Sequence, residues 1–157
     1  MEDGVDHINI YSKGKTELGR MLSNFYKSEF EYKPYGKFQS VEGFWYYYLT
    51  GCKHDYLKGL YGFKAKQEGQ KLRDDRQDKD GLTATDVEIL LEAIRCKLRQ
   101  NRRILKLLIQ SSLPFKHYYC YGDKVIYLPQ YDWIVDEIER IRSVCKQKLI
   151  DTPKQSL

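Results

Sequence analysis

Apolar residues recur every three or four positions in two stretches of the second half of the chain. The first stripe consists of Val87, Leu90, Leu91, Ile94 and Leu98, and the second of Ile134, Ile138, Ile141, Cys145 and Leu149. This spacing places each stripe on one face of a helix, so both stretches are predicted to be helices with one buried side. A further apolar set, Ile104, Leu105, Leu108 and Ile109, predicts another helix between them, ending before Pro114.

The starts of the two long helices carry capping signals. Thr85 with Glu88 three positions later has the pattern of a capping box, and Asp132 can cap the last helix. Basic residues are dense from Lys97 to Lys106, and we interpret them as a solvated helix face. Residues 115–122 between these helices are predicted to be a turn.

The first half of the chain begins with short alternating segments, which are typical of strands. Residues 8–11 and 29–32 alternate apolar and polar positions, and residues 38–39 can extend a hairpin after Pro34 and Gly36. Helices are predicted from Val41 to about residue 50, over 53–60 and over 64–73, followed by a charged loop. The fold class is therefore α+β: a predominantly helical single domain over residues 1–157, with a small N-terminal β-hairpin or sheet. Residues 152–157 are predicted to be a frayed tail.

The amino-acid composition limits the classes of protein to which this chain can belong. Hydrophobic residues make up 41% of the chain and charged residues 31%, which suits a globular domain. The sequence has neither an apolar run long enough to cross a membrane nor an N-terminal signal segment, so a cytoplasmic protein without a membrane partner is expected. The sequence does not predict an oligomeric state.

The net charge, the tyrosines and the cysteines indicate which kinds of ligand the protein could bind. The formal charge of +5 permits attraction to phosphate groups, and the 14 tyrosines offer rings and hydroxyls that suit a base or a ribose. The four cysteines lie far apart without a CxxC pair, so free thiols are expected. Cys52 and His54, with His117 and Cys120, match no compact zinc motif, and we predict no metal site and no cofactor.

The segment from Ser40 to Tyr48 carries the main candidate for chemistry. Ser40 can cap a helix that places Glu42 in its first turn, followed by the aromatic run Phe44–Tyr48. Two interpretations stand: a solvated glutamate beside core aromatics, or a carboxylate held among flat apolar faces. The second is what cleavage of an N-glycosidic bond needs, whereas the residues alone favour the first.

The same region resembles the NADAR superfamily, which is named for NAD and ADP-ribose. The resemblance consists of Leu22-Ser23-Asn24-Phe25, Gly36, Ser40-Val41-Glu42, Phe44-Trp45 and Tyr121-Gly122-Asp123. It continues weakly through Ala65-Lys66 and Gly69 and covers most of the chain, although only the first block is specific.

The resemblance implies particular roles. Glu42, Asp123 and Lys13 are the candidate catalytic residues, with Glu42 stabilising a charged ribose or activating water. The candidate substrate-binding residues are Tyr11, Ser12, Arg20, Ser23, Asn24, Phe25, Trp45, Tyr121 and Gly122. Gly43, Tyr46 and Leu49 stand where many family members have His, Gln and Lys, so the ligand site is expected to be reshaped.

The resemblance, together with the basic and tyrosine-rich composition, implies an N-glycoside hydrolase that removes ADP-ribose from modified guanine in nucleic acid. Such an enzyme would act like an antitoxin, or in counter-defence, against ADP-ribosyltransferase toxins that modify DNA. Its partner would be ADP-ribosylated nucleic acid or an ADP-ribose-like nucleotide. Two alternatives remain: hydrolysis of a small phosphorylated riboflavin-pathway intermediate, and binding of ADP-ribose or a related nucleotide without cleavage.

Overall fold

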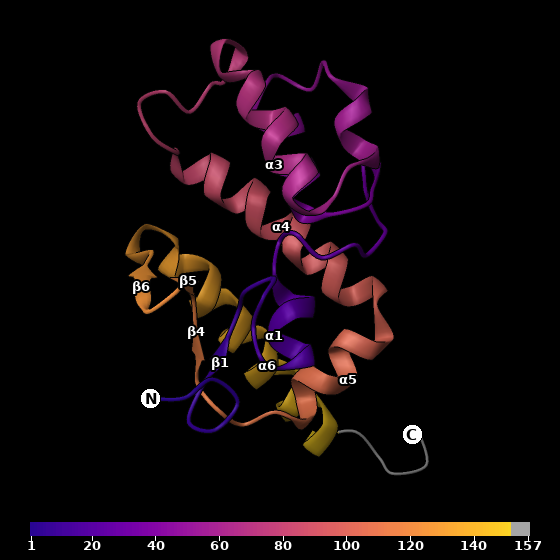
Figure 1. Ribbon diagram of the computed structural model, residues 1–157. Helices are drawn as coiled ribbons and strands as arrows, with labels where there is room; N and C mark the ends of the chain where they lie inside the picture. The colour runs from indigo at the N-terminus through magenta and orange to yellow at the C-terminus, as the bar shows by residue number, and fades with distance from the viewer. Residues whose placement is uncertain (152–157) are drawn as a thin grey trace. The chain divides into compact units, whose positions relative to one another are not determined.

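The computed structural model describes residues 1–151 (Figure 1). The chain forms two compact units: unit 1 contains residues 1–22 together with the chain from Arg103 onward, and unit 2 is Ser23–Arg102. Both units combine helices with two-stranded sheets, and helix predominates, which confirms the predicted α+β class. The single domain expected over residues 1–157 stays a prediction. The predicted tail, residues 152–157, lies outside the described residues.

Unit 2 opens with a hairpin. Strand β2 (Phe30–Tyr32) pairs antiparallel with β3 (Gly36–Phe38), and Phe30 lies opposite Phe38. Both phenylalanines are fully buried, and their rings stack with centroids 5.8 Å apart. The predicted N-terminal hairpin is therefore confirmed.

Helix α2 (Val41–Leu49) packs its buried aromatic residues on this hairpin. The Phe44 ring stacks on Phe38 with centroids 5.0 Å apart, and the Tyr47 ring lies 5.4 Å from the same phenylalanine. Ser40 caps the helix as predicted, since its Oγ accepts a hydrogen bond from the Gly43 amide at 3.0 Å. The Ser40 hydroxyl also donates to the Leu60 carbonyl at 2.9 Å, which fixes the helix start against the next segment.

The rest of unit 2 is helical. It comprises the 3-10 turn η1 (Asp55–Gly59), α3 (Gly62–Lys71), the 3-10 turn η2 (Arg73–Asp75) and the long helix α4 (Ala84–Gln100). The predicted capping box at Thr85 is wrong by two positions. Thr83 is the cap, because its Oγ1 accepts from the Asp86 amide at 3.1 Å while the Asp86 carboxylate accepts from the Thr83 amide at 2.9 Å. A carboxylate on the third helical residue thus decides where α4 starts.

Unit 1 contains more strand than the sequence pattern predicts. Strand β1 (Ile8–Asn9) pairs in parallel with β4 (Phe115–Lys116), and β5 (Tyr118–Tyr121) pairs antiparallel with β6 (Lys124–Tyr127), as Figure 1 shows. The interpretation of residues 115–122 as a turn is therefore wrong. Aromatic and β-branched side chains favour strands, and the actual turn is at Gly122, with a φ of +60°.

Helices α1 (Glu17–Leu22), α5 (Arg102–Gln110) and α6 (Asp132–Asp151) complete the described part of the chain, with the 3-10 turn η3 (Pro129–Tyr131) before α6. Ile104, Leu108 and Ile138 of the predicted stripes are fully buried, whereas Leu149, predicted at the end of the last stripe, is exposed. Asp132 is the first helical residue of α6 rather than the residue before it. Among residues 1–151, no helix has both the length and the apolar content to cross a bilayer.

Gly43 explains why α2 can approach η1 so closely. A Cβ atom added at Gly43 would lie 2.6 Å from the Leu57 carbonyl oxygen and 3.1 Å from that of Leu60. Both neighbours are main-chain atoms, so neither can rotate away as a side-chain tip would. The glycine beside Glu42 is thus required by packing.

We expect Gly43→Ala to destabilise unit 2 by about 1–3 kcal/mol, the usual range for overpacking a core position. Chemical denaturation measures the effect. Gly59→Ala is the matched control, because a Cβ there meets nothing within 4 Å and should change stability by less than about 0.5 kcal/mol. Equal stability of the two variants would contradict the proposed close approach.

Candidate functional site

Two separate parts of the sequence meet at the start of α2. The Glu42 amide donates a hydrogen bond to the Asn24 carbonyl at 3.0 Å. The turn that carries Asn24 is closed by Ser23, whose Oγ accepts from the Phe25 amide at 3.2 Å. The Phe25 carbonyl in turn accepts from the Gly62 amide at 2.9 Å, at the start of α3. The structure therefore brings the Ser23–Phe25 turn and the Ser40–Glu42 segment into direct contact.

Glu42 lies in the first turn of α2, where main-chain amides point toward the helix start. The residue keeps a part of its surface accessible, yet burial raises the pKa of its carboxyl group from 4.5 to about 7. The positive charges of Lys66 and Arg76 act in the opposite direction and lower that pKa. Because burial outweighs them, this carboxyl group can exchange a proton near neutral pH.

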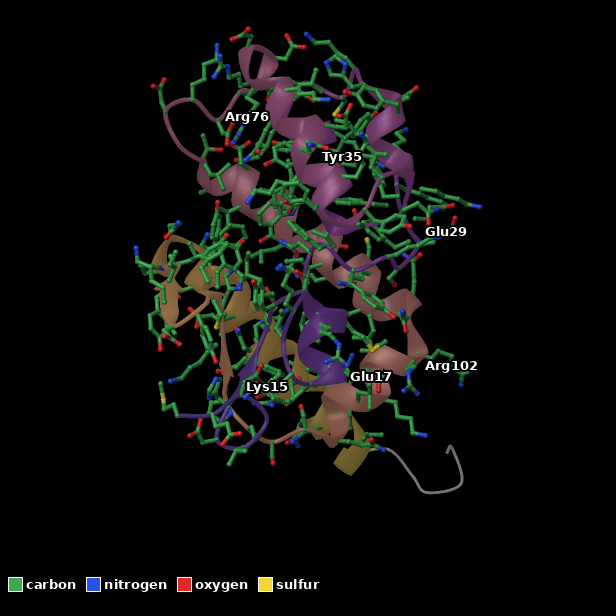
Figure 2. All side chains as sticks on the ribbon, in the orientation of Figure 1. Lys15, Glu17, Glu29, Tyr35, Arg76 and Arg102 are labelled. Atoms are coloured by element: carbon green, nitrogen blue, oxygen red, sulfur yellow. The ribbon has the colours of Figure 1, made fainter. Side chains whose placement is uncertain are left out.

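The residues around Glu42 come from α2, α3 and the segment after α3. Trp45 and Tyr46 follow Glu42 by three and four positions, which places them on its side of the helix. Gly69 of α3 lies against Tyr46 so closely that an added Cβ would be 2.0 Å from its Cγ. The Arg76 guanidinium carbon lies 5.5 Å from the Tyr46 ring centroid (Figure 2 labels Arg76), and Arg76 Nε donates to Asp78 at 2.8 Å.

We call Glu42, Tyr46, Lys66 and Arg76 the Glu42 cluster. It combines a carboxyl group that titrates near neutrality with an aromatic face and two cations. Such a group can donate a proton to a leaving base, or, when ionised, stabilise positive charge on a sugar and activate water. The cations can attract a phosphate-bearing ligand.

The other rings of α2 serve mainly the fold. Phe44 and Tyr47 are buried against the hairpin, and the Lys58 ammonium lies 4.8 Å from the Tyr47 ring centroid. The Tyr48 hydroxyl donates to the Asp86 carboxylate at 2.7 Å. For these rings the interpretation as core aromatics is correct. Glu42 is half-buried, and burial raises the pKa of its carboxyl group.

The predicted N-terminal site residues belong to unit 1. Tyr11 and Ser12 are partly exposed and Lys13 is exposed, all in the segment between β1 and α1. The Tyr11 ring lies 5.3 Å from the Tyr119 ring. The Arg20 guanidinium donates to the Gly14 carbonyl at 2.8 Å, so it holds this segment.

Tyr121, Gly122 and Asp123 also belong to unit 1, at the tip of the β5–β6 hairpin. All three are exposed, and the positive φ of Gly122 forms the turn that presents Asp123 to solvent. The structure thus brings together Ser23, Asn24, Phe25, Glu42 and Trp45 within unit 2. The functional roles of Asp123, Lys13 and the remaining unit 1 residues stay predictions.

The sequence pattern missed one residue of this region. Lys97 was interpreted as part of a solvated basic face, but its side chain is 1% exposed. It follows Leu90 by seven positions and Ile94 by three, so it lies on the apolar stripe of α4 itself. A lysine in register with a buried stripe was the signal that could have identified it.

A groove of about 720 Å³ lies elsewhere in unit 2. Side chains of the β2–β3 hairpin and α4 line it, among them Glu29, Tyr32, Lys37, Glu92, Cys96 and Arg99. Neither Glu42 nor Asn24 lines this groove, and its charged residues balance, so it does not add to the site. All four cysteines are free, and no group of three metal-ligating side chains gathers among the side chains that the structure describes, residues 1–149.

Comparisons with protein-family models, with curated proteins and with solved structures find no match to this chain.

The raised pKa of Glu42 predicts a particular dependence of stability on pH. The folded chain holds this proton more tightly than the unfolded chain, so between pH 4.5 and about 7 ionisation of Glu42 favours unfolding. Glu42→Gln removes this effect. The stability of the glutamine variant relative to wild type should therefore rise from pH 4.5 to pH 8, by up to about 3 kcal/mol in the free energy of unfolding.

Denaturant unfolding at several pH values measures this difference. Exposed Glu29, whose carboxylate accepts from the Gln39 side chain at 3.1 Å, supplies the control Glu29→Gln. If Glu42→Gln and wild type differ by the same amount at all pH values, Glu42 does not titrate in this range.

Proposed function

We propose that this chain is a divergent relative of the NADAR superfamily that hydrolyses the N-glycosidic bond between ADP-ribose and a modified guanine in nucleic acid. The observation that carries the proposal is the Glu42 carboxyl group, whose pKa burial raises and whose residue donates a main-chain hydrogen bond to the Asn24 carbonyl of the Ser23–Phe25 turn. The Ser23–Phe25 turn and the Ser40–Glu42 segment are also the residues on which the resemblance depends.

The proposed reaction breaks the bond between the anomeric carbon of the ribose and a guanine nitrogen. Positive charge builds up on the sugar as the base departs, and the ionised Glu42 carboxylate stabilises that charge. Glu42 also accepts a proton from the attacking water, whose oxygen bonds to the anomeric carbon. Glu42 then passes the proton taken from water to the departing guanine nitrogen, so the products are free ADP-ribose and the unmodified base.

The substrate would be recognised by the surrounding residues. Lys66 and Arg76 attract the diphosphate of ADP-ribose, since they carry the positive charge of the Glu42 cluster. Asn24 and Phe25, both partly accessible, offer an amide for ribose hydroxyls and a ring for stacking. Asp123 and Lys13 belong to unit 1, and their roles stay predictions.

In the cell, we propose a cytoplasmic enzyme that reverses the DNA modification made by ADP-ribosyltransferase toxins. The mild positive charge of the chain, +5, is compatible with a nucleic-acid substrate.

Glu42→Gln is expected to lower the rate of ADP-ribose release from an ADP-ribosylated guanine oligonucleotide by about a hundredfold or more, because the neutral amide can neither stabilise the cation nor accept a proton. Release of free ADP-ribose, followed by chromatography, measures the rate. Glu29→Gln, on an exposed residue of the same unit, should match wild type (Figure 2 labels Glu29).

Three compounds separate the possible outcomes: the ADP-ribosylated oligonucleotide, the phosphorylated riboflavin-pathway N-glycoside and free ADP-ribose. If wild type cleaves only the riboflavin-pathway N-glycoside, that compound replaces the proposed substrate. If wild type binds ADP-ribose but cleaves neither the oligonucleotide nor the N-glycoside, the protein is a binding module. Equal rates for Glu42→Gln and wild type would reject Glu42 as the catalytic residue.

The pH dependence of kcat tests the protonation state that Glu42 uses. Because the carboxylate form acts, kcat should rise through about pH 7 and level off above it. A rate that falls through the same range would mean that Glu42 acts as an acid toward the leaving base instead.

A further inference from the structure

Lys97 is an unusual residue for the interior of unit 2. It lies in the last turn of α4 with 1% of its side chain exposed, in register with the fully buried Leu90. Lysine is rarely buried to this extent, because its charged form loses hydration that only a partner can replace. The contacts of its ammonium group therefore define its role.

The Lys97 ammonium contacts the Ser23–Phe25 turn. Its Nζ donates a hydrogen bond to the Ser23 carbonyl at 2.9 Å and lies 5.7 Å from the centroid of the Tyr26 ring. Among the described side chains, residues 1–149, no carboxylate forms an ion pair with it. Burial accordingly lowers the pKa of Lys97 to about 7. Since a buried ammonium without a counterion adds little stability, the residue is better explained by what it holds.

Two successive carbonyl groups of the turn thus accept hydrogen bonds from two different helices. The Ser23 carbonyl accepts from Lys97 of α4, and the Asn24 carbonyl accepts from the Glu42 amide of α2. The Ser23 carbonyl also accepts from the Tyr26 amide at 3.1 Å, which closes the turn. Fixing both carbonyls fixes the peptide that carries the Asn24 side chain relative to Glu42.

We propose that Lys97 is a positioning residue of the Glu42 site: by holding the Ser23 carbonyl, it sets the distance between the Asn24 peptide and Glu42. The catalytic part of this inference depends on the proposed N-glycoside hydrolysis, whereas the positioning itself does not. Displacing a substrate-binding group by about 1 Å is enough to slow a reaction by about a hundredfold.

Hydrogen exchange of individual amides tests the positioning without any substrate. In Lys97→Met the chain keeps its volume but loses the donor. The Glu42, Phe25 and Tyr26 amides, which depend on the turn, should then exchange about tenfold faster or more. Amides in the middle of α4 should exchange as in wild type. Lys64→Met, which changes an exposed lysine of α3, should leave all of them unchanged.

The outcomes are distinct. Unchanged exchange at the three turn amides, or equally faster exchange throughout unit 2, would overturn the positioning role. If Lys97→Met does not fold, the positioning role is tested on the wild-type protein by NMR. A scalar coupling between Lys97 Nζ and the Ser23 carbonyl carbon, transmitted across their hydrogen bond, is expected. Its absence would overturn the inference.

Activity tests the catalytic part separately. If wild type hydrolyses ADP-ribosyl-guanine, Lys97→Met should lower kcat by about ten- to a hundredfold with a smaller change in KM. If wild type does not hydrolyse it, the proposed function fails while the exchange experiment still decides the positioning. Faster exchange of the turn amides with unchanged kcat would show that Lys97 holds the turn but does not serve catalysis.

Discussion

Burial of the Glu42 carboxyl group is the constraint on which the organisation of unit 2 depends. A carboxylate placed among protein atoms loses hydration, and here the charges of Lys66 and Arg76 offset only a part of that loss. A fold that served stability alone would place an apolar residue at this position. The close packing of α2 against α3 and η1 produces the burial, and the main-chain hydrogen bond from Glu42 to Asn24 fixes the turn beside it.

Two glycines make this close packing possible. Gly43 lets the η1 carbonyls approach α2, and Gly69 lets α3 lie directly on the Tyr46 ring. Gly43 also excludes a larger side chain at this position, because a Cβ atom there would collide with the main chain of Leu57. Packing, charge and turn geometry thus act on the same few residues, and the proposed chemistry uses the carboxyl group that they enclose.

The fold was largely predictable where side-chain pattern decides structure. The stripes of α4 and α6, the β2–β3 hairpin and the Ser40 cap follow from local periodicity and local hydrogen bonding. The β1–β4 pair was not predictable from the sequence, because it joins strands more than a hundred residues apart. The start of α4 was misplaced because Thr83 and Thr85 are both able to cap, and only the reach of the Asp86 carboxylate selects between them.

In the candidate site, too, some features follow from the sequence and others only from tertiary contacts. The resemblance groups Asn24 and Glu42 in one site, and the structure joins them by a main-chain hydrogen bond, whereas the catalytic role of Glu42 stays a prediction. The basic neighbours of Lys97, Arg99, Arg102 and Arg103, favour a solvated face, whereas its register with the buried stripe of α4 favours burial. The tertiary contact between α4 and the Ser23–Phe25 turn shows that the residue is buried.

The most direct test of the central claim is the titration of the Glu42 side-chain carboxyl carbon by NMR, assigned by comparison with Glu42→Gln. A midpoint near pH 7 is expected if burial outweighs the neighbouring cations. A midpoint at or below about 4.5, the value of a hydrated glutamate, would contradict the account, because the carboxyl group would then be an ordinary ionised surface group.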